Sequence, residues 1–282
     1  MKAFLRWIVV TVCTVVLTTL GLNAFDNRDN PQNSMLGAAY TAVRGGESSK
    51  CPKGMTFVGA AGGGFCIDVY EASTGDSCTT ENPASKSQTS DNLAISSCKP
   101  VTEPKRTPWR NVSRDQAELA CARAGKRLPT ATEWYKAALG TPDGATPTEN
   151  GCNIGLRGSG TLADTGSRSE CLSPAGAYDM IGNGWEWTQE TVSNGMLGAM
   201  QLPPEGYITG IDGNGIPIAT DHDVPDESFF ADYFWMDQTD TRGILRGGYW
   251  NSQTDAGQYA INITVPPSFS GEAAGFRCVK DL

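Results

Sequence analysis

The longest apolar run in the sequence lies at the N-terminus. It extends from Trp7 to Leu22, follows the basic residues Lys2 and Arg6, and gives way to a polar stretch beginning at residue 23. A basic start followed by a short apolar stretch is typical of a secretory signal. The run is short for a bilayer span, which needs about 20 apolar residues. We therefore predict that residues 1–24 are a signal peptide, with an uncleaved membrane anchor as the alternative.

Two helices are predicted by their capping patterns. Residues 113–116 read Ser-Arg-Asp-Gln, and residues 130–133 read Thr-Ala-Thr-Glu. In this pattern the first hydroxyl accepts a hydrogen bond from a backbone amide, and the side chain three residues later reaches back to the start of the helix. Small apolar residues then repeat at helical spacing in both segments. Gly125 and Gly140 mark the two helix ends.

Strand patterns are clearest near the two ends of the C-terminal part of the chain. Residues 65–70 alternate between apolar and other side chains, and residues 276–279 are a plausible partner strand. Gly247 and Gly248 permit backbone conformations closed to other residues, so they predict a tight bend before Tyr249. Between residues 251 and 273 neither helical nor strand periodicity is evident. This segment is predicted to be a displayed loop.

Two further stretches are predicted to be excursions from the domain. Residues 73–108 are rich in Ser, Thr, Asn and Pro and read as a long surface segment. Residues 193–243 contain a predicted turn at 212–215 and five aromatic residues between 229 and 235. These aromatics favour a packing cluster, and the alternative is that one or two of them rim the displayed loop.

Composition fits one exported domain behind a linker. Residues 25–50 are polar and predict a linker or stalk, and residues 51–282 are the right length for one elaborate domain. The net charge is −9 and no basic patch is evident. Because nucleic acids and anionic membranes are bound by clustered cations, we expect neither as a partner. A membrane contact is expected only through the N-terminal segment, if that segment is not cleaved.

Four motifs identify a family. They are KRLPTATEWYKAA at 126–138, YDMIGNGWEWT at 178–188, RGGYW at 246–250 and GFRCV at 275–279. Together they resemble the sulfatase-modifying-factor, or formylglycine-generating-enzyme, family over roughly residues 51–282. The resemblance implies an α+β, C-type-lectin-like fold with much irregular structure.

Cysteine content indicates disulfides. Cys13 lies in the apolar N-terminal run, and the other eight cysteines make an even set in an exported chain. Spacing alone cannot choose among their pairings. Proximity in the sequence suggests Cys51–Cys66, Cys78–Cys98 and Cys152–Cys171, which leaves Cys121–Cys278, a pair that resembles a bridge of the family. A structural zinc site is the alternative, disfavoured by the lack of a CxxC motif.

The catalytic groups of the family are missing. Formylglycine-generating enzymes use two cysteines after the RGG motif to bind copper, and the matching positions here are Ser252 and Gly257. Sulfoxide-synthase relatives use a three-histidine iron site, whereas His222 is the one histidine of this chain. We therefore expect neither copper nor iron, and we predict no catalytic residues. A divergent enzyme remains the alternative.

Calcium is the one cofactor that the resemblance suggests. Family members hold calcium with side-chain and carbonyl oxygens, which hard cations prefer. The matching residues here are Asn153, Ile154, Asn183, Gly184 and Glu186. Alternatively, Asn183 and Glu186 satisfy backbone groups instead.

With catalysis unsupported, the displayed segment is the predicted site. It also resembles the variable region of lectin-like proteins diversified by retroelements, and an ordinary loop of fixed function is the alternative. A rigid scaffold presenting an irregular surface is typical of a recognition module. We predict a secreted or cell-surface protein that binds a protein or glycan outside the cell, with a structural surface protein as a further alternative. The predicted contact residues are Tyr249, Asn251, Ser252, Gln253, Ala256, Tyr259, Ile261, Ile263, Thr264, Val265, Phe269, Gly271 and Glu272.

Overall fold

The computed structural model describes residues 50–60, 63–143, 148–155 and 160–282. The predicted signal segment and almost all of the predicted linker lie outside these residues. Residues 52–282 form one compact unit. No helix in the described part of the chain has the length and apolar content that a membrane crossing requires.

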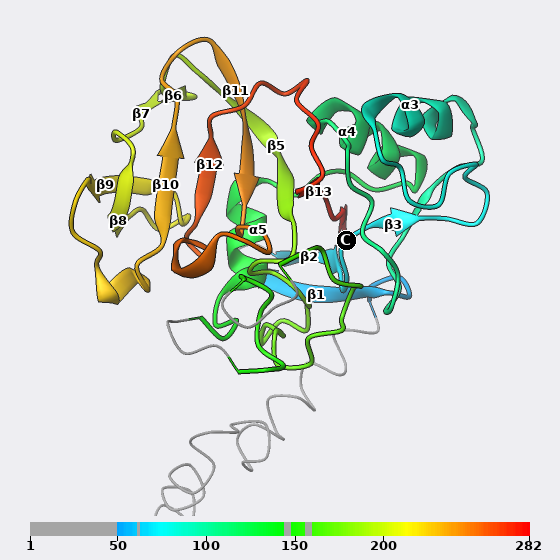
Figure 1. The fold of residues 1–282 in the computed structure, drawn as a ribbon, viewed down its shortest axis with the longest axis horizontal. Helices are drawn as coiled ribbons and strands as arrows, with labels where there is room; N and C mark the ends of the chain where they lie inside the picture. The colour runs from blue at the N-terminus through cyan, green and yellow to red at the C-terminus, as the bar shows by residue number, and fades with distance from the viewer. Residues whose placement is uncertain (1–49, 61–62, 144–147, 156–159) are drawn as a thin grey trace, which may run out of the picture. The chain divides into compact units, whose positions relative to one another are not determined.

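A long, mostly antiparallel sheet dominates this unit (Figure 1). Its strands run in the order β7-β6-β5-β11-β12-β10-β8-β9, and β13 pairs with β5 at one end. The pairings β10–β12 and β13–β5 are parallel. The bounds are β5 Trp185–Ser193, β6 Met196–Leu197, β7 Met200–Gln201, β8 Gly206–Ile211, β9 Pro217–Asp221, β10 Tyr233–Met236, β11 Thr241–Arg246, β12 Ile261–Ile263 and β13 Ala274–Gly275.

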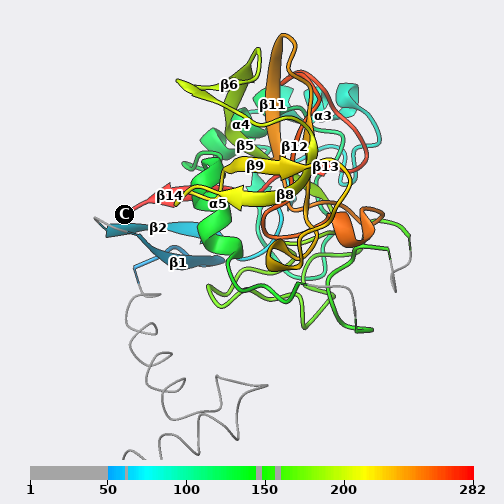
Figure 2. The same ribbon diagram turned by 90° about the vertical axis from the view of Figure 1, so that its left-hand side faces the viewer.

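A second sheet joins the two ends of the unit. It has the order β1-β2-β14, and Figure 2 shows these three strands side by side. Ile67 of β2 is paired with Val279 of β14, which confirms the predicted pairing between the first and last strands of the domain. The bounds are β1 Met55–Ala60, β2 Gly63–Asp68 and β14 Val279–Asp281, and a short pair is formed by β3 Ser73–Thr74 and β4 Pro100–Val101.

Both predicted helices are present with their caps. Helix α4 spans Arg114–Arg123 and helix α5 spans Ala131–Ala138. Ser113 and Thr130 each accept a hydrogen bond from the backbone amide three residues on, and each capping box is complete. Gly125 and Gly140 have φ angles of 67° and 78°, so both take the left-handed conformation expected just after a helix end.

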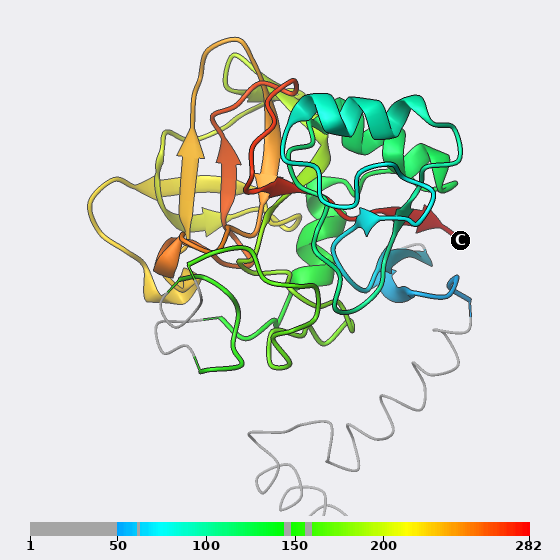
Figure 3. The same cartoon turned by 45° about the vertical axis from the view of Figure 1, so that its right-hand side comes forward.

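The stretch 73–108 differs from the predicted surface excursion. It contains helix α3, Lys86–Ala94, which packs beside α4 (Figure 3). Trp109 donates a hydrogen bond of 3.2 Å from its indole nitrogen to the Thr89 hydroxyl, and Leu93 belongs to the core. The helix has few apolar residues, so its packing is set by these tertiary contacts rather than by a sequence stripe.

The stretch 193–243 is part of the scaffold. Its strands β6 to β10 extend the long sheet, and the predicted turn at 212–215 closes the β8–β9 hairpin. A one-turn helix at Glu227–Phe229 carries the start of the aromatic run. Phe234 is fully buried, whereas Trp235 is only partly buried and faces a groove. The packing interpretation holds for Phe234, whereas Phe230 is 38% exposed and Trp235 matches the alternative that one or two of these aromatics rim the displayed segment.

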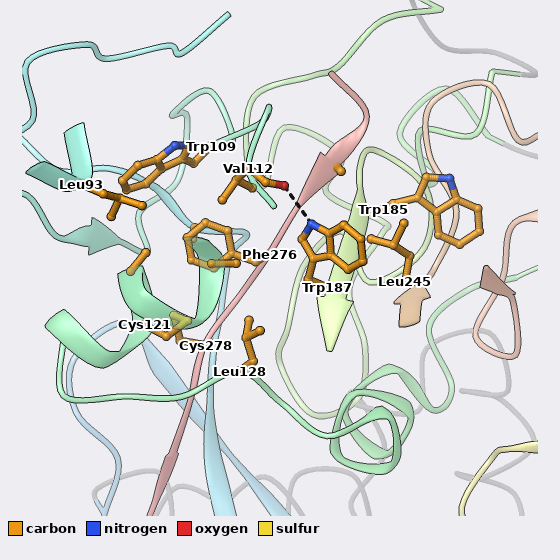
Figure 4. Close-up of a cluster of buried hydrophobic side chains, with 14 of the residues drawn as sticks. Leu93, Trp109, Val112, Cys121, Leu128, Trp185, Trp187, Leu245, Phe276 and Cys278 are labelled. Carbon is orange, nitrogen blue, oxygen red and sulfur yellow. Dashed lines mark hydrogen bonds between the residues drawn. A yellow bond between two sulfur atoms is a disulfide. The ribbon is translucent and has the colours of Figure 1, made fainter. Parts of the chain in front are cut away.

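Disulfides tie the helical side of the unit to the terminal strand. Cys121–Cys278 joins α4 to the residue just before β14, while Cys78–Cys98 and Cys152–Cys171 close short loops. Cys51 and Cys66 are disulfide-bonded as well. Figure 4 shows the Cys121–Cys278 sulfurs at one end of a buried cluster that continues past Phe276 to Trp185. The disulfides indicate a chain that reaches an oxidising compartment.

We predict that the Cys121–Cys278 bridge contributes more stability than Cys78–Cys98. The first closes a loop of 157 residues and the second a loop of 20. The chain-entropy relation assigns about 2 kcal/mol more to the longer loop. Replacing each pair by alanine and measuring thermal unfolding should give the larger fall in Tm for the 121/278 variant. Equal losses, or a larger loss for 78/98, would contradict this.

Candidate ligand-binding groove

A groove of about 560 Å³ opens where the long sheet meets the segment 249–274. Its walls combine aromatic, amide and carboxylate side chains. The lining residues are Trp185, Trp235, Leu245, Tyr249, Asn251, Ser252, Asp255, Asn262, Val265, Phe269, Gly271, Glu272, Ala273 and Ala274.

Strand pairing places the floor of this groove. Leu245 of β11 is paired with Asn262 of β12, and Asn262 is paired with Trp235 of β10. Directly paired residues have side chains on the same face of a sheet. These three residues therefore form one row across three strands.

Aromatic rings make one wall. The Trp185 and Trp235 rings meet edge to face with centroids 5.3 Å apart, and Trp185 stacks on Tyr249 at 6.5 Å. Trp185 is 7% exposed, so it belongs both to the core and to the groove wall. Phe269 is 38% exposed at the rim. The wall is thus held by core packing while one edge stays open.

The bend before the groove needs two glycines. Gly247 and Gly248 have φ angles of 91° and 89°. A Cβ on Gly247 would lie 2.7 Å from the Met180 carbonyl oxygen, and one on Gly248 would lie 2.4 Å from the Ala256 Cβ. The predicted tight bend is confirmed, and it sends the chain from β11 directly into the groove wall.

About half of the predicted contact residues line the groove. These are Tyr249, Asn251, Ser252, Val265, Phe269, Gly271 and Glu272. Gln253 is exposed outside the lining, and Thr264 bonds to the side chain of Asn262. Tyr259 instead packs against Tyr135, Phe229 and Phe230, away from the lining.

Three predicted contact residues lie inside the protein. Ile261 and Ile263 are 1% exposed and Ala256 is 2% exposed. The segment is not a continuous loop, because residues 261–263 form strand β12 in the middle of the long sheet. Side chains alternate along a strand, so both isoleucines enter the core while Asn262 between them faces the groove. A three-residue strand is too short to reveal this alternation in the sequence.

The other half of the lining is outside the predicted contact set: Trp185, Trp235, Leu245, Asp255, Asn262, Ala273 and Ala274. Trp235 belongs to the aromatic run for which packing is the favoured prediction and a place at the rim of the displayed segment is the alternative. Trp185 sits in a family motif that reads as scaffold, and Asp255 lies among residues of no evident period. The approach of Trp185 and Trp235 depends on strand order, which no local pattern encodes.

The residues matched to calcium sites form a buried hydrogen-bond network. The Asn183 side-chain oxygen accepts from Asn153 at 3.0 Å and from the Ala163 amide at 2.8 Å. The Asn183 amide donates to Glu71 at 2.6 Å. Of the two asparagine side-chain oxygens, that of Asn153 is the one without a partner among the described residues.

Glu186 does not fit a calcium ligand in this arrangement. Its carboxylate accepts hydrogen bonds from Arg277 at 2.6–2.9 Å and from the Trp134 indole at 2.7 Å. Gly184 and Ile154 could offer only backbone oxygens. Within the described residues, no cluster of three or more His, Cys, Asp or Glu side chains is placed to hold a metal. Calcium binding stays a prediction. The alternative, that Asn183 and Glu186 satisfy backbone groups, matches Asn183, which bonds to the amide and carbonyl of Ala163. It does not match Glu186, whose hydrogen bonds come from the side chains of Arg277 and Trp134.

The positions of the family's copper-binding cysteines are occupied differently. The Ser252 hydroxyl accepts a hydrogen bond of 3.0 Å from the Tyr249 amide. A Cβ on Gly257 would lie 1.9 Å from the carboxylate of Asp232, which is fully buried. Asp232 accepts a hydrogen bond from the Tyr259 amide at 2.7 Å. The space beside residue 257 is therefore filled by a carboxylate from a different segment.

Buried acids surround Arg277. Besides the paired Glu186, Glu71 and Asp179 lie in the same network. Burial and the neighbouring negative charges raise the pKa of Glu71 well above its usual value. Burial also raises the pKa of Asp179, to about 6. The Arg277 guanidinium thus has several neighbouring acids, and folding favours the protonated form of Glu71.

Residues 59–282 match the sulfatase-modifying factor enzyme 1-like domain. The match spans most of the chain, so the protein belongs to that family, and its fold is the α+β, C-type-lectin-like fold of the family. The chain is 28% identical over 202 residues to the formylglycine-generating enzyme of Thermomonospora curvata, which covers 64% of this chain and 58% of that protein.

Other relatives carry different names. The inactive C-alpha-formylglycine-generating enzyme 2 of Mus musculus is 35% identical over 108 residues, covering 32% of this chain and 34% of that protein. Among solved structures, the Major Tropism Determinant U1 variant matches with a TM-score of 0.45 and 20% identity, over 82% of this chain and 53% of that one. The chain spans between 21% and 58% of the length of its curated relatives.

We predict that Glu71→Gln stabilises the protein at neutral pH. An acid whose pKa is raised by folding stabilises the fold fully below its unfolded pKa, near 4, and loses that contribution as pH rises through the folded value. Glutamine keeps the hydrogen bond from Asn183 and carries no charge. Thermal unfolding should therefore show a higher Tm for the variant at pH 8 and no gain at pH 4. The exposed Glu227→Gln is the control, and a uniform loss of Tm in Glu71→Gln at all pH values would contradict the prediction.

Proposed function

We propose that this protein is an exported, non-catalytic recognition module that binds a ligand in the groove described above. The proposal rests on two independent features of one groove: part of its lining comes from the segment that resembles a variable region, and the rest comes from the packed sheet. The segment that resembles a variable region by sequence supplies Asn251, Phe269 and Glu272 to the lining of the groove. The remaining wall belongs to the packed sheet.

The rigidity of the scaffold supports this role. The groove floor is built on paired strands, and the Trp185 wall is continuous with the core cluster that contains Phe276 and the Cys121–Cys278 bridge. A preorganised surface loses little conformational entropy when a ligand binds. Side chains at the rim can then differ without disturbing the fold, because surface changes usually alter stability by no more than about 0.5 kcal/mol.

The chemistry of the family's enzymes is the main alternative. Formylglycine formation in the family needs the cysteine pair that Ser252 and Gly257 replace here. The histidine that a second kind of site would need, His222, has a side chain that is 79% exposed beside Asp223. Recognition fits these residues better than either metal chemistry of the family.

A matched pair of aromatic substitutions tests the recognition role. Phe269 and Phe230 are equally exposed, at 38%, and Phe269 alone of the two lines the groove. We expect Phe269→Ala to remove binding found on arrays of extracellular proteins and glycans, with little change in Tm, because aromatic anchors dominate many interfaces. Phe230→Ala should keep that binding. Equal binding by both variants and the wild type would contradict the groove as the site.

We also predict that cysteine cannot restore formylglycine chemistry here. In the double variant Ser252→Cys, Gly257→Cys, the new side chain at 257 would overlap Asp232, and overpacking of this kind costs about 1–3 kcal/mol. Incubation of wild type and variant with copper, oxygen and a sulfatase-type cysteine peptide should leave the peptide unchanged by mass spectrometry. An active formylglycine-generating enzyme is the control. Formylglycine produced by the wild type would overturn the non-catalytic assignment.

A further inference from the structure

The charges in the groove are all of one sign. Its lining contains two carboxylates, Asp255 and Glu272, and no Lys, Arg or His from the described residues. The whole chain has a net charge of −9. A cation entering the groove would therefore meet favourable charge and no basic side chain from the described lining.

Asp255 is the more informative of the two carboxylates. It is half-buried, and no hydrogen bond or ion pair from the described residues reaches its side chain. Burial raises the pKa of Asp255, and no basic group in the described part of the chain offsets that effect. Glu272 differs, because its side chain is 73% exposed and lies 4.0 Å from Arg110. A partly desolvated carboxylate without a donor is costly unless a ligand supplies one.

The aromatic wall suits a planar cation. Trp185 and Tyr249 are stacked with an interplanar angle of 25°, and Trp235 meets Trp185 at 90°. The faces of such rings attract cations, and a guanidinium also stacks on them. Leu245 and Val265 in the same lining can cover the methylene stem of a long basic side chain.

We propose that the groove receives an arginine side chain of a partner protein, with its guanidinium placed between the aromatic wall and Asp255. Arginine fits better than lysine because it combines a planar stacking surface with a two-pronged donor for a carboxylate. This proposal rests on the recognition function proposed above and names its ligand chemistry.

A neutral glycan is the competing ligand class. Sugars also stack on aromatic rings and bond to amide side chains, and Asn251 and Asn262 line the groove. The Asn262 oxygen is already engaged by the amide and hydroxyl of Thr264, at 3.0 and 2.7 Å. A neutral ligand does not need the negative charge of Asp255, so the two classes respond differently when that charge is removed.

The test uses the full oxidised chain with ¹⁵N-labelled tryptophan. N-acetyl-arginine amide is titrated while the indole N–H signals are followed, with Trp185→Phe and Trp235→Phe providing their assignment. N-acetyl-citrulline amide has nearly the same shape without the positive charge and is the matched control. We expect saturable shifts of the Trp185 and Trp235 signals with the arginine probe and none with citrulline.

Two carboxylate variants test which negative charge in the groove binds the arginine probe. Asp255→Asn keeps the shape of the side chain and should weaken arginine binding at least about tenfold, the loss expected for a charge-assisted contact in a partly desolvated site. Glu272→Gln should change it less than about threefold, because this carboxylate is exposed and screened. Equal shifts with citrulline, or binding unchanged in Asp255→Asn, would overturn the proposal.

The outcomes also distinguish a failure of the arginine proposal from a failure of the proposed recognition function. Array binding that depends on Phe269, together with no response to the arginine probe, would reject the arginine ligand while retaining the recognition role. Shifts caused by methyl glycosides and unaffected by Asp255→Asn would reject arginine in favour of a glycan. Arginine binding at Trp185 and Trp235 without any Phe269-dependent array partner would support the pocket chemistry and reject the recognition role.

Discussion

The ion pair between Arg277 and Glu186 is the contact on which the rest of this structure depends. Both side chains are essentially fully buried, with relative exposures of 0% and 1%. Arg277 also donates to the Asp68 and Tyr178 carbonyl oxygens, and Glu186 accepts from Trp134. The pair therefore joins the terminal segment, β2, α5 and β5. Removing one partner of such a pair leaves an uncompensated charge, which costs about 3–5 kcal/mol.

This constraint also orients the groove. Glu186 and Trp185 are neighbours on β5, so their side chains leave opposite faces of the strand. With Glu186 fixed against Arg277, Trp185 must face the other side, where it meets Trp235 and Tyr249. The same buried pair thus joins four segments on one face of β5 and sets the aromatic wall on the other.

The family's thiolate site differs here in its packing as well as in the residues at positions 252 and 257. Gly257 leaves room that the Asp232 side chain enters from the segment before β10, and the neighbouring Asp143 accepts the Gln258 amide at 3.0 Å. Burial and the nearby charge of Asp143 raise the pKa of Asp232 well above its usual value. Carboxylates thus organise the backbone where the family's enzymes carry cysteine. The strand that follows, β12, carries Asn262 into the groove.

Short-range sequence signals determined several structural elements of this protein. Capping boxes determined the starts of α4 and α5, and paired glycines determined the bend after Arg246, because each of these signals acts over a few residues. Proximity in the sequence suggested the disulfides Cys78–Cys98 and Cys152–Cys171. Only about half of the residues that line the groove could be predicted from the sequence. Asn251 and Phe269 lie in the irregular segment that the sequence singles out, whereas Ile261 and Ile263 of that segment are buried, and Trp185 and Trp235 come from strands elsewhere in the chain. Strand order and register decide these positions, because they depend on contacts between residues far apart in the chain, which no local pattern encodes.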